Sequence, residues 1–250
     1  MKPQIQTAYK KKENMLNRDE NVISRVSISG RLLTDEQINL IGVKHNEFLL
    51  QAVKGVNWSS NDVNNDFNIF FNNLATSENI NLAFEGEPKN YQDNFDIVKS
   101  HLEENNSVNY FESVDSFFSN DLEGKSVKQI TLFLTSLKEE FAENTNSVRD
   151  YEAFLVYTSI LKHSAVFWLP TDLGGEGHFD MYKAARTPGW KKCLTDVLES
   201  DGMSGTAGFI IGAGIAAAAT GPVAPITFVA EIALGAGASS AWTWYRSINC

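Results

Sequence analysis

Acidic side chains and a histidine gather in one glycine-rich stretch of the chain, Asp172-Leu-Gly-Gly-Glu-Gly-His-Phe-Asp180. Carboxylates and imidazole are the groups that hold metal ions or transfer protons, so such chemistry is expected first in a cluster of this kind. The spacing matches neither an EF-hand calcium loop nor the H-E-x-x-H motif of a zinc protease. We therefore interpret residues 172–180 as a connecting loop.

His45 is the other residue that could do chemistry, and it shares one face of a predicted helix with Ile38, Ile41 and Phe48. A single histidine among apolar neighbours is more often a hydrogen-bonded core residue than a metal ligand or a base. The chain contains no G-x-S-x-G nucleophile motif, no phosphate-binding G-x-x-x-x-G-K-[ST] motif and no dinucleotide-binding fingerprint. These observations predict a protein that is not an enzyme and has no cofactor or metal. An enzyme that uses His45 or the 172–180 loop is the alternative.

The most unusual composition lies near the end of the chain, from Gly202 to Tyr245, where Glu231 is the only charged residue. The stretch Gly221-Pro-Val-Ala-Pro225 is incompatible with one uninterrupted helix, so the chain is expected to double back there. Small residues recur every three or four positions on both arms and leave a flat stripe that a second helix could approach closely. The predicted packing positions are Gly205, Gly208, Gly212 and Ala216 on the first arm, and Ala230, Gly235 and Ser239 on the second.

A membrane is one possible neighbour for these arms, because each just reaches the about 17 to 25 residues that a spanning helix needs. The apolar side chains of either arm favour insertion by only about 2 kcal/mol, and Glu231 cancels most of this gain in the second arm. Insertion would therefore have to be cooperative or conditional. Trp242 and Trp244 would then lie at the membrane interface, although the same residues could equally cap a soluble core.

Basic residues flank the arms, whereas the turn between them carries no charge. If the arms insert, both of their ends should stay on the cytoplasmic side, because positive charge is retained there. The flanking basic residues are Lys183, Arg186, Lys191, Lys192 and Arg246.

The chain has 250 residues, of which 43% are hydrophobic, and this is enough to bury one sizeable core. The formal net charge of −10 argues against a nucleic-acid partner, because no basic surface is available to replace phosphate counterions. Residues 1–31 contain lysines but no following apolar run, so no cleavable secretory signal is predicted. We expect a cytoplasmic or membrane-associated protein, with export by a non-standard route, or removal of a leader, as the alternatives.

Apolar residues recur at helical spacing between Thr34 and Pro170, and strand-like alternation is scarce. Thr34 followed by Gln37 has the pattern of a capping box, which starts a helix that we expect to reach about Gly55. The predicted fold class is all-α, a multi-helix bundle with a C-terminal Gly/Ala-rich helical hairpin. The predicted division is a mobile tail (1–33), an amphipathic helical domain (34–170), a glycine-rich linker (171–188), and a short tryptophan helix followed by the hairpin (189–250).

Two stretches are similar to a group of uncharacterised bacterial helical proteins. The first is the His-Asn-Glu step in Lys44-His-Asn-Glu-Phe-Leu-Leu50, and the second is the tryptophan helix that opens into the glycine-rich arms, from Trp190 to Tyr245. No activity comes with this resemblance, and many such proteins look exported or lipid-anchored. The arms also resemble the glycine-zipper hairpins of small bacteriocins and, by analogy, the sheltered hydrophobic hairpin of pore-forming colicin domains.

Two functional hypotheses follow from the contrast between the polar helices and the nearly charge-free arms. The first is a non-enzymatic, membrane-associating or pore-forming-like protein whose hairpin docks into a bilayer or self-associates. The second is a soluble all-α scaffold or interaction protein, in which the hairpin is buried as its core. The sequence identifies no specific protein partner for either.

Overall fold

The computed structural model describes residues 30–181, 190–218 and 224–247. Every regular element in these ranges is helical and none is a strand, which confirms the predicted all-α, multi-helix class. The helices are α2 (Asp35–Gly55), α3 (Val63–Ser77), α4 (Tyr91–His101), α5 (Val108–Asp121), α6 (Val127–Asn144), α7 (Val148–Trp168), the 3-10 turn η1 (Thr171–Leu173), α8 (His178–Met181), α9 (Trp190–Ala218) and α10 (Ala224–Arg246).

Helix starts follow the capping pattern of the sequence. The hydroxyl of Thr34 accepts a hydrogen bond from the backbone N–H of Gln37, and the Gln37 side chain accepts one from the backbone N–H of Thr34, so the predicted capping box is confirmed. Ser126 and Gln129 form a second capping box at the start of α6. Each box satisfies backbone donors that the first turn of a helix leaves free.

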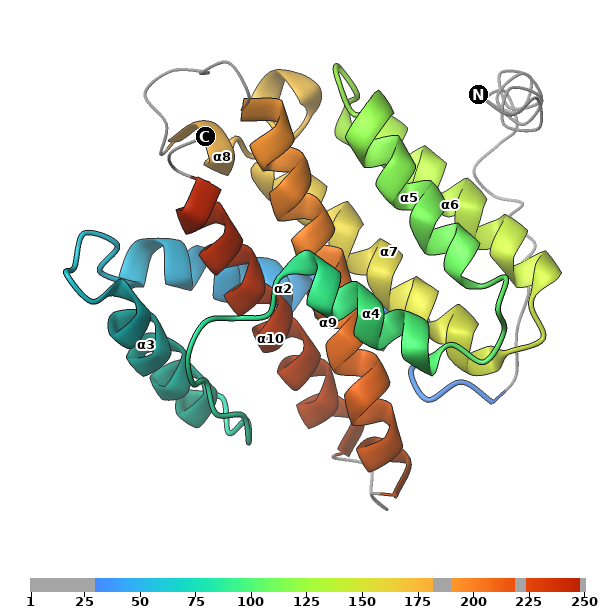
Figure 1. Ribbon diagram of the computed structural model, residues 1–250, viewed down its shortest axis with the longest axis horizontal. Helices are drawn as coiled ribbons and strands as arrows, with labels where there is room; N and C mark the ends of the chain where they lie inside the picture. The colour runs from blue at the N-terminus through green and yellow to red at the C-terminus, as the bar shows by residue number, and fades with distance from the viewer. Residues whose placement is uncertain (1–29, 182–189, 219–223, 248–250) are drawn as a thin grey trace.

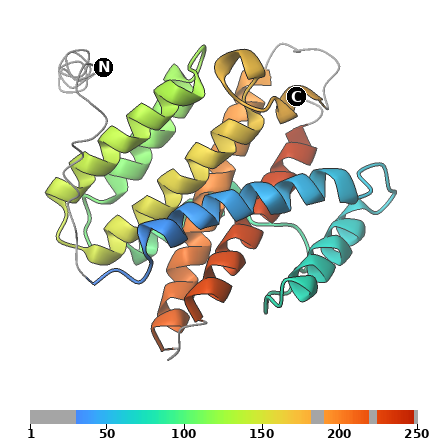
Figure 2. The ribbon, with the colours of Figure 1, turned by 180° about the vertical axis from the view of Figure 1, so that it is seen from behind.

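The antiparallel pair of α9 and α10 lies in the middle of the molecule (Figure 1). Helix α9 packs against α10, α7 and α4, whereas α10 packs against α9 and α2. Figure 2, which views the molecule from the other side, shows α2 crossing in front of the pair, with α7 running beside the pair. The residues between the two helices, 219–223, lie outside the described residues, and they include most of the predicted turn at 221–225.

Helix α9 is longer than the sequence pattern suggested. The short tryptophan helix and the first glycine-rich arm were expected as separate elements, but they form one continuous helix of 29 residues. Glycine weakens a helix by about 1 kcal/mol when it is exposed to water, so a glycine-rich helix needs close packing around it. Here Gly202 and Gly205 lie against Tyr157 and Ile160 of α7, so tertiary packing replaces the missing side chains.

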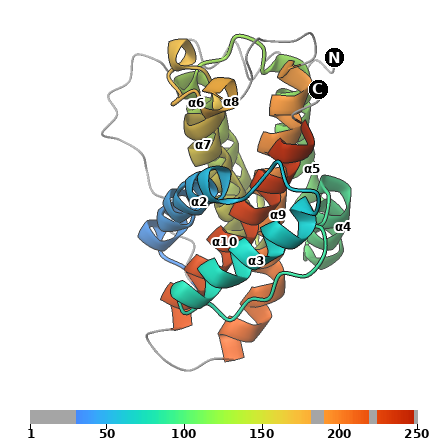
Figure 3. The same ribbon diagram turned by 90° about the vertical axis from the view of Figure 1, so that its left-hand side faces the viewer.

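Aromatic side chains hold the remaining helices to this centre. Trp58, which precedes α3, packs edge-on against Trp244 of α10, with ring centroids 5.4 Å apart. Figure 3 shows α3 on the outside of α10. On α3 itself, Phe67 and Phe71 are fully buried, whereas Phe70 is only partly buried.

The predicted terminal and linker segments are described only in part. Residues 1–29 of the predicted tail and 182–188 of the predicted linker lie outside the described residues. The described part of the linker contains η1 and α8, and Gly174 and Gly177 adopt positive φ angles of 85° and 74° there. A glycine enters this region of φ without the steric cost that a side chain would add. The division of the chain into domains stays a prediction.

Candidate functional site

A group of polar side chains lies inside the apolar core where α2, α7 and α9 meet. Asp201 of α9 accepts hydrogen bonds through Oδ2 from the hydroxyl of Ser164 and, at 3.2 Å, from the indole Nε1 of Trp168. Nε2 of His45 lies 3.8 Å from the same oxygen. We call His45, Ser164, Trp168 and Asp201 the polar core cluster. All four side chains belong to fully buried residues, which confirms the prediction that His45 is a core residue.

The neighbours of His45 fix its orientation. Its Nδ1 lies 2.9 Å from Oδ1 of Asn46, and Nδ2 of Asn46 donates at 2.9 Å to the backbone carbonyl of His163. An amide oxygen can only accept, so Nδ1 of His45 carries the proton when the ring is neutral. The unprotonated Nε2 then faces Asp201.

Burial disfavours charge on both ionisable members of the polar core cluster. It lowers the pKa of His45 to about 4, against the smaller opposing effect of the hydrogen bond to Asn46. Burial also raises the pKa of Asp201 to about 7, opposed by its hydrogen-bond donors. Removing a charged group from water favours its neutral form, and the direction of each shift follows from that.

The polar core cluster does not have the geometry of a hydrolytic triad. In a triad the serine hydroxyl is bonded to the imidazole, which accepts its proton. Here the Ser164 hydroxyl donates to Asp201, while Nε2 of His45 has no hydrogen-bond partner among the described residues. The cluster is also closed to solvent, because each of the four residues is 0% exposed.

A second unusual region lies at the opposite end of the α9–α10 pair, which projects past the ends of α4 and α7 in Figures 1 and 2. We call residues 208–212 and 226–229 the apolar end. Ile211 is 50% exposed and Ile226 is 62% exposed, although both side chains are large and apolar. Phe209 and Phe228 lie between the helices with ring centroids 5.9 Å apart, so the two helices stay in contact here.

The predicted glycine positions fall into two kinds. A Cβ atom on Gly205 would lie 2.1 Å from Cδ1 of Ile160 and 3.2 Å from Cβ of Ala236, and one on Gly212 would lie 2.4 Å from the Phe228 ring. Gly208 and Gly235 have no neighbouring atom within 4 Å of such a position. Two of these glycines therefore allow close packing, and two face open space. Ala216 lies in α9, and the structure does not describe its side-chain surroundings.

The other predicted positions of the second arm lie mostly in the core. Trp242 and Trp244 are 7% and 2% exposed. Ser239 meets Ser200 of α9, with the two hydroxyl oxygens 3.2 Å apart, and Ala230 is buried. Glu231 is partly buried, and this burial raises its pKa.

The 172–180 loop brings two of its chemical side chains together. His178 Nε2 lies 3.0 Å from a carboxylate oxygen of Glu176, and the His178 ring stacks on Phe167 with centroids 4.1 Å apart. Among the described residues no three His, Cys, Asp or Glu side chains are arranged so that they could hold a metal ion. Within the same residues, no helix combines the length and apolarity that crossing a membrane requires.

Comparisons with known protein families, with curated proteins and with solved structures find no match to this chain.

Sequence reasoning found His45 but missed its partners in the polar core cluster. Ser164, Trp168 and Asp201 lie far from His45 in the sequence, and only the packing of three helices brings them together. One signal was present, since Asp201 is the last charged residue before the uncharged run that begins at Gly202.

Proposed function

We propose that this protein is a non-enzymatic helical protein that contacts a lipid bilayer through its apolar end. One observation carries the proposal. Ile211 and Ile226 are 50% and 62% exposed at a projecting end of the molecule, inside a run from Gly202 to Ala230 that contains no charged residue. Water is an unfavourable neighbour for such a surface, and the hydrocarbon of a bilayer is a favourable one.

The contact would be shallow and reversible. Burying an isoleucine side chain completely is worth about 1.5 to 3 kcal/mol, so two half-exposed ones contribute about 2 kcal/mol together. The rest of the described part of the pair is engaged elsewhere, since Phe209, Ile210, Val229 and Leu234 are all buried in the protein. The proposal is therefore contact by one end of the pair, with most of its length held in the protein core.

Charge favours a zwitterionic lipid surface as the partner. The formal net charge of −10 would be repelled by an anionic membrane. One cation does lie beside the apolar end, because Nη2 of Arg149 in α7 donates at 3.3 Å to the backbone carbonyl of Ile210. A phosphocholine bilayer offers both apolar chains for the isoleucines and phosphate groups for this guanidinium.

A second candidate is a scaffold or interaction protein in which the pair serves only as core. The burial of Trp242 and Trp244 and the close packing of Gly205 support it. In both candidate functions the α9–α10 pair forms the core of the molecule. They differ only in what the apolar end contacts.

Flotation with phosphocholine vesicles tests the proposal. The full chain should float with the vesicles, and the double variant Ile211→Asn with Ile226→Asn should lose most of that binding. Ile69→Asn provides the matched control, because Ile69 is 51% exposed on α3 and lies outside the apolar end. Raising the salt concentration should weaken binding only slightly, since most of the contact is apolar and only the Arg149 guanidinium contributes a charge.

Three results would count against the proposal. The first is a full chain that stays with the soluble fraction. The second is equal flotation of the double variant and the wild type. The third is loss of binding in the Ile69→Asn control, because it would point to general stickiness. A dimer that disappears in the double variant, measured by light scattering without lipid, would assign the apolar end to self-association instead.

A further inference from the structure

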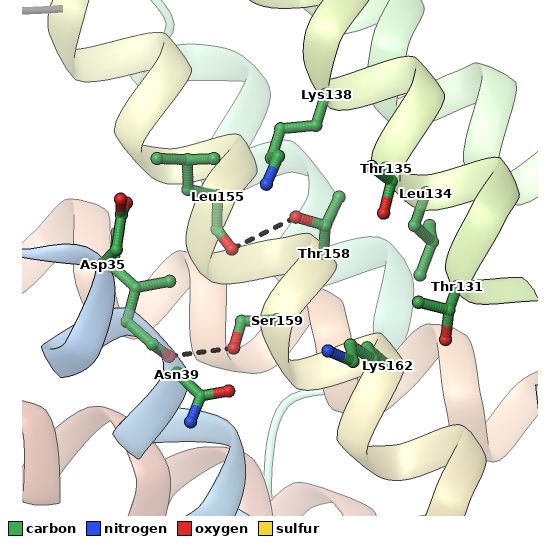
Figure 4. Close-up of a pocket in the computed structure, with 11 residues that line it drawn as sticks. Asp35, Asn39, Thr131, Leu134, Thr135, Lys138, Leu155, Thr158, Ser159 and Lys162 are labelled. Atoms are coloured by element: carbon green, nitrogen blue, oxygen red, sulfur yellow. Dashed lines mark hydrogen bonds between the residues drawn. The ribbon is translucent and has the colours of Figure 1, made fainter. Parts of the chain in front are cut away.

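A groove of about 160 Å³ lies between α2, α6 and α7, and it shares no residue with the polar core cluster or the apolar end (Figure 4). One water molecule requires roughly 10–15 Å³ of such space, so the groove has room for a small molecule. Its apolar lining comes from Ile38, Leu134 and Leu155. The rest of the lining is polar.

Two cations line the groove from different helices, Lys138 from α6 and Lys162 from α7 (Figure 4). Neither forms an ion pair with a carboxylate among the residues that the structure describes. A lysine ammonium has three donors and no acceptor, and it favours an anionic neighbour.

Two hydroxyl groups of the groove lining are already used by the protein. Thr158 donates to the backbone carbonyls of Phe154 and Leu155, and Ser159 donates at 2.8 Å to the carbonyl of Ile38 (Figure 4). The donors left for a ligand are therefore the two ammonium groups, the hydroxyls of Thr131 and Thr135, and the amide Nδ2 of Asn39.

One acidic residue, Asp35, also lines the groove. Its carboxylate is paired with Arg31 through a contact of 2.7 Å, which offsets its negative charge. The electrostatic balance of the groove is consequently set by Lys138 and Lys162. Ligands that bind by positive charge are not favoured here.

We propose that this groove binds a small oxyanion, a phosphate or a carboxylate, between Lys138 and Lys162. The two ammonium groups supply the attraction, the threonine hydroxyls of α6 supply additional hydrogen bonds, and the apolar floor accepts a short hydrocarbon part. Charge-assisted hydrogen bonds of this kind are stronger than those between neutral groups. The site is independent of lipid contact at the apolar end.

Calorimetric titration with inorganic phosphate and, separately, with succinate tests the site at constant ionic strength. One of the two anions should bind saturably to the full chain, and Lys138→Gln or Lys162→Gln should each weaken that binding at least tenfold. Lys128→Gln is the matched control, because Lys128 is exposed on the same helix as Lys138 and does not line the groove. The control should bind within twofold of the wild type.

The identity of the tighter anion decides between phosphate and carboxylate as the ligand class. Absence of saturable binding of either anion would overturn the proposal, and so would equal weakening in the Lys128→Gln control. A second measurement uses the unsubstituted protein, so that its result does not depend on whether a variant folds. The bound anion should slow acetylation of Lys138 and Lys162 several-fold, measured by peptide mass spectrometry, and leave Lys128 unchanged. Equal rates at the three lysines would contradict the site.

Discussion

The two halves of the α9–α10 pair reverse the usual distribution of polar and apolar groups. In one half, Asp201, Ser200 and Ser239 are almost completely shielded from water. In the other half, Ile211 and Ile226 are half exposed or more. Burying a carboxylate and exposing isoleucines are both unfavourable, so neither arrangement is explained by stability alone. We propose that the half around Asp201 holds the pair in place and that the half around Ile211 and Ile226 makes contact with another molecule.

The largest expected effect comes from truncating an aromatic residue in the buried half. Trp244→Ala should lower the free energy of unfolding by about 3 to 5 kcal/mol, because it removes a large buried side chain and leaves a cavity. Trp244 is 2% exposed and packs against both Trp58 and Trp168. Ile226→Ala on the same helix should change stability by less than about 0.5 kcal/mol. Urea denaturation of the two variants measures the difference, and equal losses would remove the contrast between the halves.

A smaller effect is expected from filling the space at a closely packed glycine. Gly205→Leu should cost about 1 to 3 kcal/mol, because the new side chain would overlap Ile160 and Ala236. Gly208→Leu, one helical turn away, should be neutral or slightly stabilising, since nothing lies within 4 Å of its Cβ position and leucine favours a helix. Thermal unfolding of the two variants measures this difference in stability. A destabilised Gly208→Leu would show that the outer face of α9 is packed in solution.

The polar core cluster predicts opposite pH dependences for two single variants. Burial raises the pKa of Asp201 to about 7, so the stability that this group contributes is complete at low pH and is lost as the pH rises through about 7. Burial lowers the pKa of His45 to about 4, so its contribution is complete above its ordinary pKa near 6.5 and is lost as the pH falls through about 4. Between about pH 4 and 6.5 the two trends oppose each other in the wild type.

Replacing either Asp201 or His45 should reveal the pH dependence of stability that the other residue causes. Relative to the wild type, Asp201→Asn should gain stability as the pH rises from about 4 to 6.5, because only the His45 trend is left. His45→Gln should lose stability over the same interval, because only the Asp201 trend is left. Other carboxyl groups are common to all three proteins and cancel in the comparison. Parallel stability curves for the three proteins, measured in urea at several pH values, would contradict the assignment of these groups.

The sequence was informative where structure is local. The Thr34–Gln37 and Ser126–Gln129 pairs start helices because a capping box needs only four consecutive residues. The side of a helix that each glycine faces was not predictable in this way. Gly205 and Gly208 belong to the same repeat in the sequence, yet one is packed against Ile160 and the other faces open space. That difference depends on how α9 is rotated against α7 and α10.

The partners of His45 could not be predicted for a similar reason. Ser164 and Asp201 are separated from it by more than a hundred residues, and neither belongs to a recognisable motif. Tertiary packing determines which buried polar groups meet, and composition alone does not predict it. The exposure of the two isoleucines was not predictable either, because the pattern of small residues does not show which faces of the arms other helices cover.

Contact between the apolar end and lipid can be measured most directly with an environment-sensitive fluorophore. The label is attached through Ile226→Cys, with Ile69→Cys as the control site and the unsubstituted protein as the blank for labelling of its own cysteines. On addition of phosphocholine vesicles, the label at 226 should shift to shorter wavelength and become shielded from an aqueous quencher, whereas the label at 69 should not change. Identical spectra with and without vesicles at position 226 would contradict the proposed lipid contact.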